Sequence, residues 1–162
     1  MPRFAPLSLS SLPGSVWRRS FMIRFGDCDP AGIVYTPEYF NIFNGVIEDW
    51  YGQCLGLPYP MLIGQRRMGL GYAHVSADFS QPSSMGEVLE AAIIVKSIGR
   101  SSVALSVHAF KAGVECVRAN FVTVTTSLRD HSVIAIPDDL RQAFETYRQG
   151  CNVPELSESV VQ

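Results

Sequence analysis

The segment RFGDCDPAGIVYTPEYF (residues 24–40) decides how the rest of this chain is interpreted. It places two acids, Asp27 and Asp29, at the end of an alternating stretch, and a glycine-containing turn separates them from Thr-Pro-Glu at positions 36–38. Because proline suits the first helical position and an acid is favoured in the first turn, a helix is predicted to begin there. The unpaired N–H groups of a helix N-terminus can hold a carbonyl oxygen that develops negative charge. A carboxylate beside such a terminus suggests acyl chemistry.

Periodic patterns on both sides of this segment predict a strand and a long helix. Residues 17–25 alternate with the period of two that is typical of a half-buried strand. From Thr36 onward, apolar residues recur at steps of three and four up to Gly56, which is a favourable C-terminal cap. Residues 57–71, rich in glycine and proline, are expected to connect this helix to the next strand.

Strand patterns dominate the rest of the chain. Residues 71–80, 88–98, 102–110 and 115–128 are separated by short turns, which predicts antiparallel neighbours, and a last amphipathic helix is predicted over 138–148. One curved antiparallel β-sheet wrapped around the long central α-helix buries both apolar faces, so an α+β fold is expected. Such a sheet leaves its edge strands open, and a dimer that pairs them is expected to cover them.

Length and composition describe one ordered domain. The chain has 162 residues, 47% hydrophobic and 17% charged, which is enough to bury a proper core. We expect a single domain over residues 17–150, with flexible tails at residues 1–16 and 151–162.

Charge and cysteine content argue against several classes of function. The formal net charge is −2 and no basic run exceeds two residues, so bulk nucleic-acid binding is not expected. No apolar run is long enough to span a bilayer, and no membrane association is expected. The four cysteines form no CxxC pair and no cluster with histidines at metal-ligand spacing, so neither zinc nor a disulfide framework is indicated. We therefore expect a cytoplasmic protein with reduced thiols.

The motif GDCDPAGIV (residues 26–34), followed by Pro37 and by Tyr39-Phe40, resembles the signature of the 4-hydroxybenzoyl-CoA thioesterase branch of the hot-dog fold. The resemblance in pattern continues through the helix and the strand order to about Ile136. It implies a hydrolase that acts on the thioester of an acyl-coenzyme A substrate and uses neither a metal nor a cofactor. A homodimer that assembles into a homotetramer is expected.

Two positions of the motif carry the chemistry that the resemblance implies. The acid matching Asp29 attacks the thioester carbonyl or activates water, and the backbone N–H at Thr36 holds the carbonyl oxygen. A tyrosine stands at the Thr36 position in that branch, so this chain departs there in its side chain and keeps the backbone role. Tyr35 next to it is a candidate for shaping the acyl pocket. Because a thioester carbonyl lacks strong resonance, one carboxylate and preorganised N–H donors suffice for hydrolysis.

Three more residues are candidates for contacts with the substrate. Arg100 resembles the basic strand-end residues of the family and is expected to contact CoA phosphates, with Lys96 as a second cation on the same hairpin. His74 is the third candidate, whereas structural roles are expected for His108 and His131.

Several alternatives compete with this interpretation. Asp27 and Asp29 point the same way in an extended segment, and Asp27 is expected to cap a turn. In related hot-dog enzymes the working carboxylate comes from the central helix, where Glu48 is the candidate. Cys28 has no nearby histidine base, so a thiol nucleophile is disfavoured. A hot-dog hydratase pairs its aspartate with a histidine a few residues on, and none follows Asp29 before His74.

The substrate also has alternatives. An aromatic acyl group such as benzoyl or hydroxybenzoyl is expected, and a short or medium aliphatic acyl-CoA or an acyl-carrier-protein thioester is the runner-up. A non-catalytic acyl-CoA-binding module would keep the pocket and lack a competent carboxylate.

Overall fold

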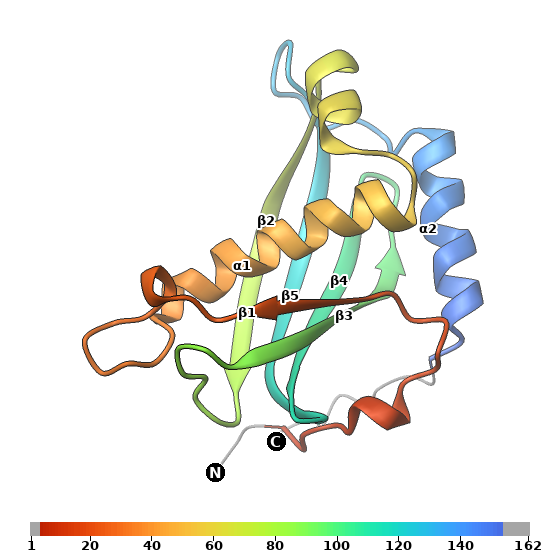
Figure 1. Ribbon diagram of the computed structural model, residues 1–162. Helices are drawn as coiled ribbons and strands as arrows, with labels where there is room; N and C mark the ends of the chain where they lie inside the picture. Colours follow the sequence, from red (N-terminus) through yellow and green to blue (C-terminus); the bar gives the residue numbers. More distant parts are fainter. Residues whose placement is uncertain (1–3, 154–162) are drawn as a thin grey trace, which may run out of the picture.

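The structure, a computed structural model that describes residues 4–153, is one curved sheet with a long helix across one face (Figure 1). All neighbouring strands are antiparallel, in the order β1-β3-β4-β5-β2. The strands span Arg18–Met22 (β1), Met68–Phe79 (β2), Val88–Ile98 (β3), Ser102–Lys111 (β4) and Val114–Ser127 (β5).

The long helix α1 (Thr36–Asp49) buries one face against the sheet. Phe40 meets Phe121 of β5 edge to face, with ring centroids 6.4 Å apart. The fully covered side chains recur at the predicted steps of three and four: Tyr39, Phe43, Val46 and Ile47.

A π-helical turn, η3 (Trp50–Cys54), continues α1 towards Gly56. Gly56 has a φ of +70°, which lets the N–H of Leu57 donate to the carbonyl of Tyr51 (2.9 Å). The glycine therefore ends the helical segment in the manner that the sequence predicts. The connection that follows contains another turn, η4 (Pro60–Gln65), before β2 begins.

β1 is shorter than the strand predicted over residues 17–25. Its pairing continues through Ile23, whose N–H donates to the carbonyl of Glu87 (2.9 Å). Beyond that point the chain turns into a short 3-10 helix, η2 (Phe25–Asp27), because the carboxylate of Asp27 binds the backbone N–H of Arg24. The alternating pattern of residues 17–25 is therefore longer than the strand that it predicts.

The two edges of the sheet differ. β1 pairs with β3 only as far as Ala92, and beyond it α2 (Asp138–Cys151) lies along β3, where Tyr147 donates to the carbonyl of Ile93 (2.5 Å). β2 pairs with β5 alone, so within residues 4–153 no strand covers its other side. A long open edge is a place for another chain to pair.

An N-terminal strap, residues 4–16, packs against the sheet where a flexible tail is expected. Leu12 and Val16 belong to the buried core. The N–H of Glu115 in β5 donates to the carbonyl of Leu7 (2.9 Å), and the N–H of Leu7 donates to the Glu115 carboxylate (2.9 Å). The prolines and serines of this segment suggest a loose tail. Its docking is not visible in the local sequence, because its hydrogen-bond partners lie about a hundred residues further along the chain.

The tail expected over residues 151–162 falls mostly outside the described part of the chain. Cys151 is the last residue of α2 and is buried, and residues 154–162 lie outside the described residues.

Candidate functional site: the loop before the central helix

Backbone hydrogen bonds close the base of the loop between β1 and α1. The carbonyl of Asp27 accepts the N–H of Tyr35 (2.9 Å), and Cys28 forms an isolated antiparallel bridge with Val34. The Asp27 carboxylate is used locally, because its Oδ2 accepts the N–H of Arg24 (2.8 Å). Asp27 thus makes the turn-capping contact expected of it, and the closed loop delivers the chain directly to α1.

Asp29 lies just beyond this closure and is held by a tight turn. Its N–H donates to the carbonyl of Ile33 (3.0 Å), and its carbonyl accepts the N–H of Gly32 (2.9 Å), which has a φ of +79°. The half-buried carboxylate accepts the N–H of Ala31 through Oδ1 (2.8 Å), while Oδ2 has no hydrogen bond to any described residue. One oxygen therefore orients the carboxylate, and the other is available to a ligand.

The N-terminus of α1 has no capping side chain. Tyr35, the N-cap residue, makes no side-chain hydrogen bond, and its carbonyl accepts the N–H of Glu38 (2.8 Å). Pro37 has no N–H, and the N–H of Thr36 donates to no acceptor among residues 4–153. This exposed position therefore offers a backbone donor at the positive end of the helix dipole.

Ser83, in the connection between β2 and β3, fixes the loop to the rest of the fold. Its carbonyl accepts the N–H of Val34 (2.9 Å), and its neighbour Ser84 forms a bridge with Ile33. The Ser83 side chain is fully buried near α1. Burial raises the pKa of Tyr39 in the first turn of α1, and a hydrogen bond with Ser83 opposes that shift. Sequence reasoning misses Ser83, because its partners are distant in sequence.

Exposed apolar side chains surround the loop. Phe25 is 83% exposed, Tyr35 is 54% exposed and Met85 is 56% exposed. Met85 belongs to this surface because the N–H of the next residue, Gly86, donates to the carbonyl of Ile23 just before the loop (2.8 Å). Apolar surface beside a carboxylate suits an apolar ligand or a second subunit.

Arg100 lies at the other end of the sheet from Asp29. The loop that carries Asp29 follows β1, which pairs with the start of β3, whereas Arg100 follows the end of β3. Figure 1 shows these two turns on opposite sides of the molecule. At about 3.3 Å per residue, β3 separates them by about 30 Å. One chain alone does not bring these two residues together.

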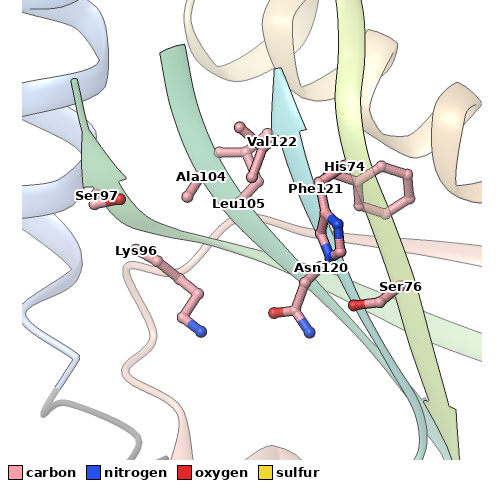
Figure 2. A pocket seen from close by; sticks show the side chains of 9 residues that line it. All are labelled: His74, Ser76, Lys96, Ser97, Ala104, Leu105, Asn120, Phe121 and Val122. Carbon is pink, nitrogen blue, oxygen red and sulfur yellow. The ribbon is translucent and has the colours of Figure 1, made fainter. Parts of the chain in front are cut away.

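His74 and Lys96 both line a pocket on the outer face of the sheet, the face turned away from α1 (Figure 2), from strands that have β4 and β5 between them. The structure therefore places two of the expected substrate contacts around one pocket without contact between them, and it separates both of them from the loop before α1.

The alternative catalytic groups occupy other surroundings. Glu48 is exposed on α1, twelve residues after Thr36, which is about 18 Å along the helix axis. The thiol of Cys28 donates to the carbonyl of Arg24 (3.5 Å).

Within residues 4–153, no group of three or more His, Cys, Asp or Glu side chains is placed to hold a metal ion. No helix in this part of the chain is long and apolar enough to cross a membrane.

His108 belongs to a buried polar network under the N-terminal strap. Its Nδ1 lies 2.6 Å from Oε1 of Glu115, and its Nε2 lies 2.8 Å from the hydroxyl of Ser106. Arg118 donates two further hydrogen bonds to Glu115 (2.6 and 2.8 Å). The order serine, histidine, acid is that of a hydrolytic triad, but the Ser106 hydroxyl is enclosed, since this residue is 2% exposed. The contacts of His108 are those of a structural residue.

Comparison with known proteins identifies a family. The family described as the thioesterase-like superfamily matches residues 23–144. The chain is 31% identical over 81 residues to the 4-hydroxybenzoyl-CoA thioesterase of Pseudomonas sp. (strain CBS-3), a match over 49% of this chain and 57% of that enzyme. It is 25% identical over 137 residues to the 1,4-dihydroxy-2-naphthoyl-CoA hydrolase of Nostoc punctiforme (strain ATCC 29133 / PCC 73102), covering 85% of this chain and 92% of the relative.

Solved structures agree with this assignment. A thioesterase superfamily protein from Jannaschia sp. CCS1 superposes with a TM-score of 0.77 at 25% identity, covering 83% of this chain and 94% of its own. The gentisyl-coenzyme A thioesterase BH1999 gives a TM-score of 0.73 at 24% identity, over 79% of this chain and 99% of its own, which shows likeness of fold. The predicted hot-dog fold and the resemblance to the 4-hydroxybenzoyl-CoA thioesterase branch are confirmed, and the chain belongs to the thioesterase-like superfamily.

Proposed function

We propose that this protein hydrolyses acyl-CoA thioesters and that its substrates carry aromatic acyl groups, such as benzoyl or hydroxybenzoyl. The names of two relatives specify aromatic acyl-CoA substrates, which supports this choice. Two groups carry the proposal, Oδ2 of Asp29 and the N–H of Thr36. Neither has a hydrogen-bond partner among residues 4–153, and they belong to a loop and a helix start that are tied together.

In the proposed reaction the thioester carbonyl oxygen accepts the N–H of Thr36, where the helix dipole favours the negative charge that develops. Oδ2 of Asp29 takes a proton from water, and the water oxygen bonds to the acyl carbon. The C–S bond then breaks, CoA leaves as the thiolate, and the thiolate takes up the proton. In the nucleophilic variant, Asp29 itself bonds to the acyl carbon and expels CoA, and water hydrolyses the resulting anhydride. Both routes release a carboxylic acid and CoA.

The acyl group lies against the exposed aromatic side chains beside the loop. Phe25 and Tyr35 present rings to solvent at this point, and aromatic rings bind one another in offset or edge-to-face arrangements. Tyr35 is the N-cap residue of α1, so its side chain starts one residue from the proposed carbonyl site and contributes to acyl preference.

A second subunit completes the site in this proposal. Arg100 is the proposed contact for CoA phosphates, and about 30 Å of β3 separates it from Asp29 in the same chain. Pairing of two β2 edges into one continuous sheet would make a homodimer in which one chain supplies Asp29 and the other Arg100. We infer that such dimers assemble into a homotetramer in the cytoplasm, where the four free cysteines stay reduced.

A substrate profile tests the proposal. Release of CoA is measured with benzoyl-CoA, hydroxybenzoyl-CoA and straight-chain acyl-CoAs of short and medium length. A kcat/KM that is highest for the aromatic thioesters supports it. Preference for the straight chains assigns the aliphatic acyl-CoA or carrier-protein thioesterase instead, and negligible rates on all of them, with binding retained, indicate a non-catalytic acyl-CoA-binding module.

A further inference from the structure

The connection between β2 and β3, residues 80–87, docks on the loop that carries Asp29. Figure 1 shows the two segments next to each other at one end of the sheet. Ser84 forms an isolated antiparallel bridge with Ile33, and the carbonyl of Ile33 accepts the N–H of Asp29 (3.0 Å). The turn around Asp29 therefore rests on Ser84.

The neighbouring residue Ser83 holds the other side of the proposed site. Its carbonyl accepts the N–H of Val34 (2.9 Å), two residues before Thr36. Two consecutive residues of the connection thus bind the turn around Asp29 and the segment that leads to Thr36. The separation of the Asp29 carboxylate from the N–H of Thr36 therefore depends on where this dipeptide lies.

Two charged side chains fix the dipeptide. Lys111, the last residue of β4, donates to the carbonyl of Pro82 (2.7 Å) and to Oε2 of Glu87 (3.2 Å). The same oxygen of Glu87 accepts the N–H of Ser84 (2.7 Å). Lys111 and Glu87 therefore clamp the connection on both sides of Ser83, next to the residues that bind the loop.

The clamp is charged at neutral pH. Hydrogen bonds from the N–H of Ser84 and from Lys111 lower the pKa of Glu87, so its carboxylate is ionised there. Hydrogen bonds with an ionised group are roughly twice as strong as those between neutral groups. The side chains are 23% exposed for Lys111 and 37% exposed for Glu87, so either can be replaced without opening a cavity in the core.

We propose that Lys111 and Glu87 are positioning residues of the hydrolysis, because they set where the connection holds the loop. Through the connection they fix the carboxylate of Asp29 relative to the N–H of Thr36. They act through the backbone of residues 82–84 and not by contact with the substrate. This role rests on the proposed function. A displacement of about 1 Å in a catalytic site can cost about 10²-fold in rate, so such support matters.

Steady-state hydrolysis by conservative variants tests this role, with benzoyl-CoA or, if the wild type prefers straight chains, hexanoyl-CoA. Lys111→Gln is expected to lower kcat about tenfold or more with KM nearly unchanged. Lys111→Arg keeps a cation that can donate to the Pro82 carbonyl, so it is expected to recover most of the activity. Glu87→Gln keeps an acceptor for the N–H of Ser84, whereas Glu87→Ala removes it and is expected to have the lower kcat.

Arg66→Gln is the matched control. Arg66 forms an exposed ion pair with Asp139 (2.7 Å) near the start of β2, whereas the connection follows the end of that strand. Loss of this pair is expected to leave kcat unchanged. Thermal denaturation of all variants shows whether a lower kcat follows from a general loss of stability.

Hydrogen–deuterium exchange gives a readout that needs no enzyme activity. Lys111→Gln is expected to speed exchange of the backbone amides of residues 29–34, because the residues that bind this loop lose their support. Arg66→Gln is expected to leave the same amides unchanged. Peptide mass spectrometry of the full-length protein measures both variants.

Each result decides the proposal. A loss of kcat in Lys111→Gln that Lys111→Arg recovers, together with faster exchange at residues 29–34, supports it. Unchanged kcat or unchanged exchange in Lys111→Gln overturns it, as does a rise in KM alone, which would make Lys111 a substrate contact. Equal losses of kcat in Lys111→Gln and Arg66→Gln also overturn it. If the wild type hydrolyses neither thioester, the proposed function fails, and the exchange data decide separately whether the clamp holds the loop.

Discussion

The carbonyl of Asp27 accepts the N–H of Tyr35 at 2.9 Å, and this bond joins the two ends of the loop that carries Asp29. Each acid binds one backbone N–H through one carboxylate oxygen: Oδ2 of Asp27 binds that of Arg24, and Oδ1 of Asp29 binds that of Ala31. The two acids differ in position, because Asp27 lies at the closed base of the loop and Asp29 lies beyond it. The proposed chemistry depends on this difference in position.

Asp29→Asn is expected to lower kcat by about 10²–10⁴-fold with little change in KM, because the amide can neither take a proton from water nor attack the carbonyl. Asp27→Asn is the control, since its amide oxygen can still accept the N–H of Arg24. Steady-state hydrolysis of benzoyl-CoA measures both variants. Equal activity of the two variants would remove Asp29 from the mechanism.

Thr36→Pro deletes the proposed carbonyl donor without an obvious conflict in the backbone. Tyr35 before it has φ −66° and ψ 124°, which a residue preceding proline adopts readily. Loss of one such donor is expected to cost about 10²–10³-fold in kcat. Thr36→Ala keeps the N–H and should remain active within a few-fold, so similar activity of the proline and alanine variants would place the carbonyl elsewhere. Circular dichroism confirms that α1 is retained.

Gly32→Ala tests the tight turn around Asp29. A Cβ at this position meets nothing within 4 Å, so the cost comes from the φ of +79° and is expected to be about 1–2 kcal/mol. Because the turn orients the carboxylate, kcat is expected to fall by more than the loss of stability explains. Gly26→Ala is the control, with open space and no positive φ. Thermal denaturation and kcat are measured on both, and unchanged kcat in Gly32→Ala would mean that the turn does not orient Asp29.

The buried network predicts a loss of stability in acid. Burial alone would raise the pKa of Glu115, but hydrogen bonds from Arg118 and His108 lower it to about 2. A carboxyl with a depressed pKa stabilises the fold fully at neutral pH, and this contribution disappears as the pH falls through about 4 towards 2. Burial also lowers the pKa of His108 in the folded protein. Below about pH 6.5 the unfolded chain therefore binds a proton that the folded protein does not, which lowers the free energy of unfolding as well.

Urea denaturation between pH 7 and pH 3 measures this effect. Glu115→Gln is expected to lower the free energy of unfolding by about 3 kcal/mol or more at pH 7, because it leaves Arg118 without its buried partner. The same variant is expected to lose less stability than the wild type between pH 7 and pH 3. His131→Asn is the control, since this exposed residue has a φ of +59° that asparagine tolerates. If Glu115→Gln loses as much stability as the wild type between pH 7 and pH 3, the pH dependence belongs to surface acids.

Complementation between inactive variants tests the composite site. Asp29→Asn and Arg100→Ala each damage a different half of it in the proposed dimer. Coexpression at equal levels should leave about a quarter of the sites with both residues intact, and hydrolysis at low CoA-ester concentration should recover accordingly. Recovery that stays at the level of the separate variants would place Arg100 outside the site of the neighbouring chain.

Patterns local in sequence predict the elements of this fold well. The apolar periodicity from Thr36 to Gly56 corresponds to α1 and the π-helical turn that extends it, and the alternating stretches correspond to β2–β5. Periodicity does not distinguish Asp27 from Asp29, because an extended segment gives both the same direction, and the sequence favours Asp29 only through the resemblance of the motif. In the structure the 3-10 turn and the turn at Gly32 separate the two acids.

Contacts between distant residues leave no such pattern. Ser83 reaches the loop and α1 from the connection after β2, and the N-terminal strap reaches Glu115 from its place at the other end of the chain. The sequence predicts that Arg100 and Lys96, four residues apart, contact the same ligand. The strand bulge near Lys96 and the turn after β3 place them in different surroundings.

The strap has a consequence for the order in which this chain acquires its structure during synthesis. Glu115, the hydrogen-bond partner of Leu7, is translated more than a hundred residues after it. The strap therefore has no partner in the sheet until β5 has been made. A segment that the ribosome releases before the sheet is complete thus docks on it among the later steps.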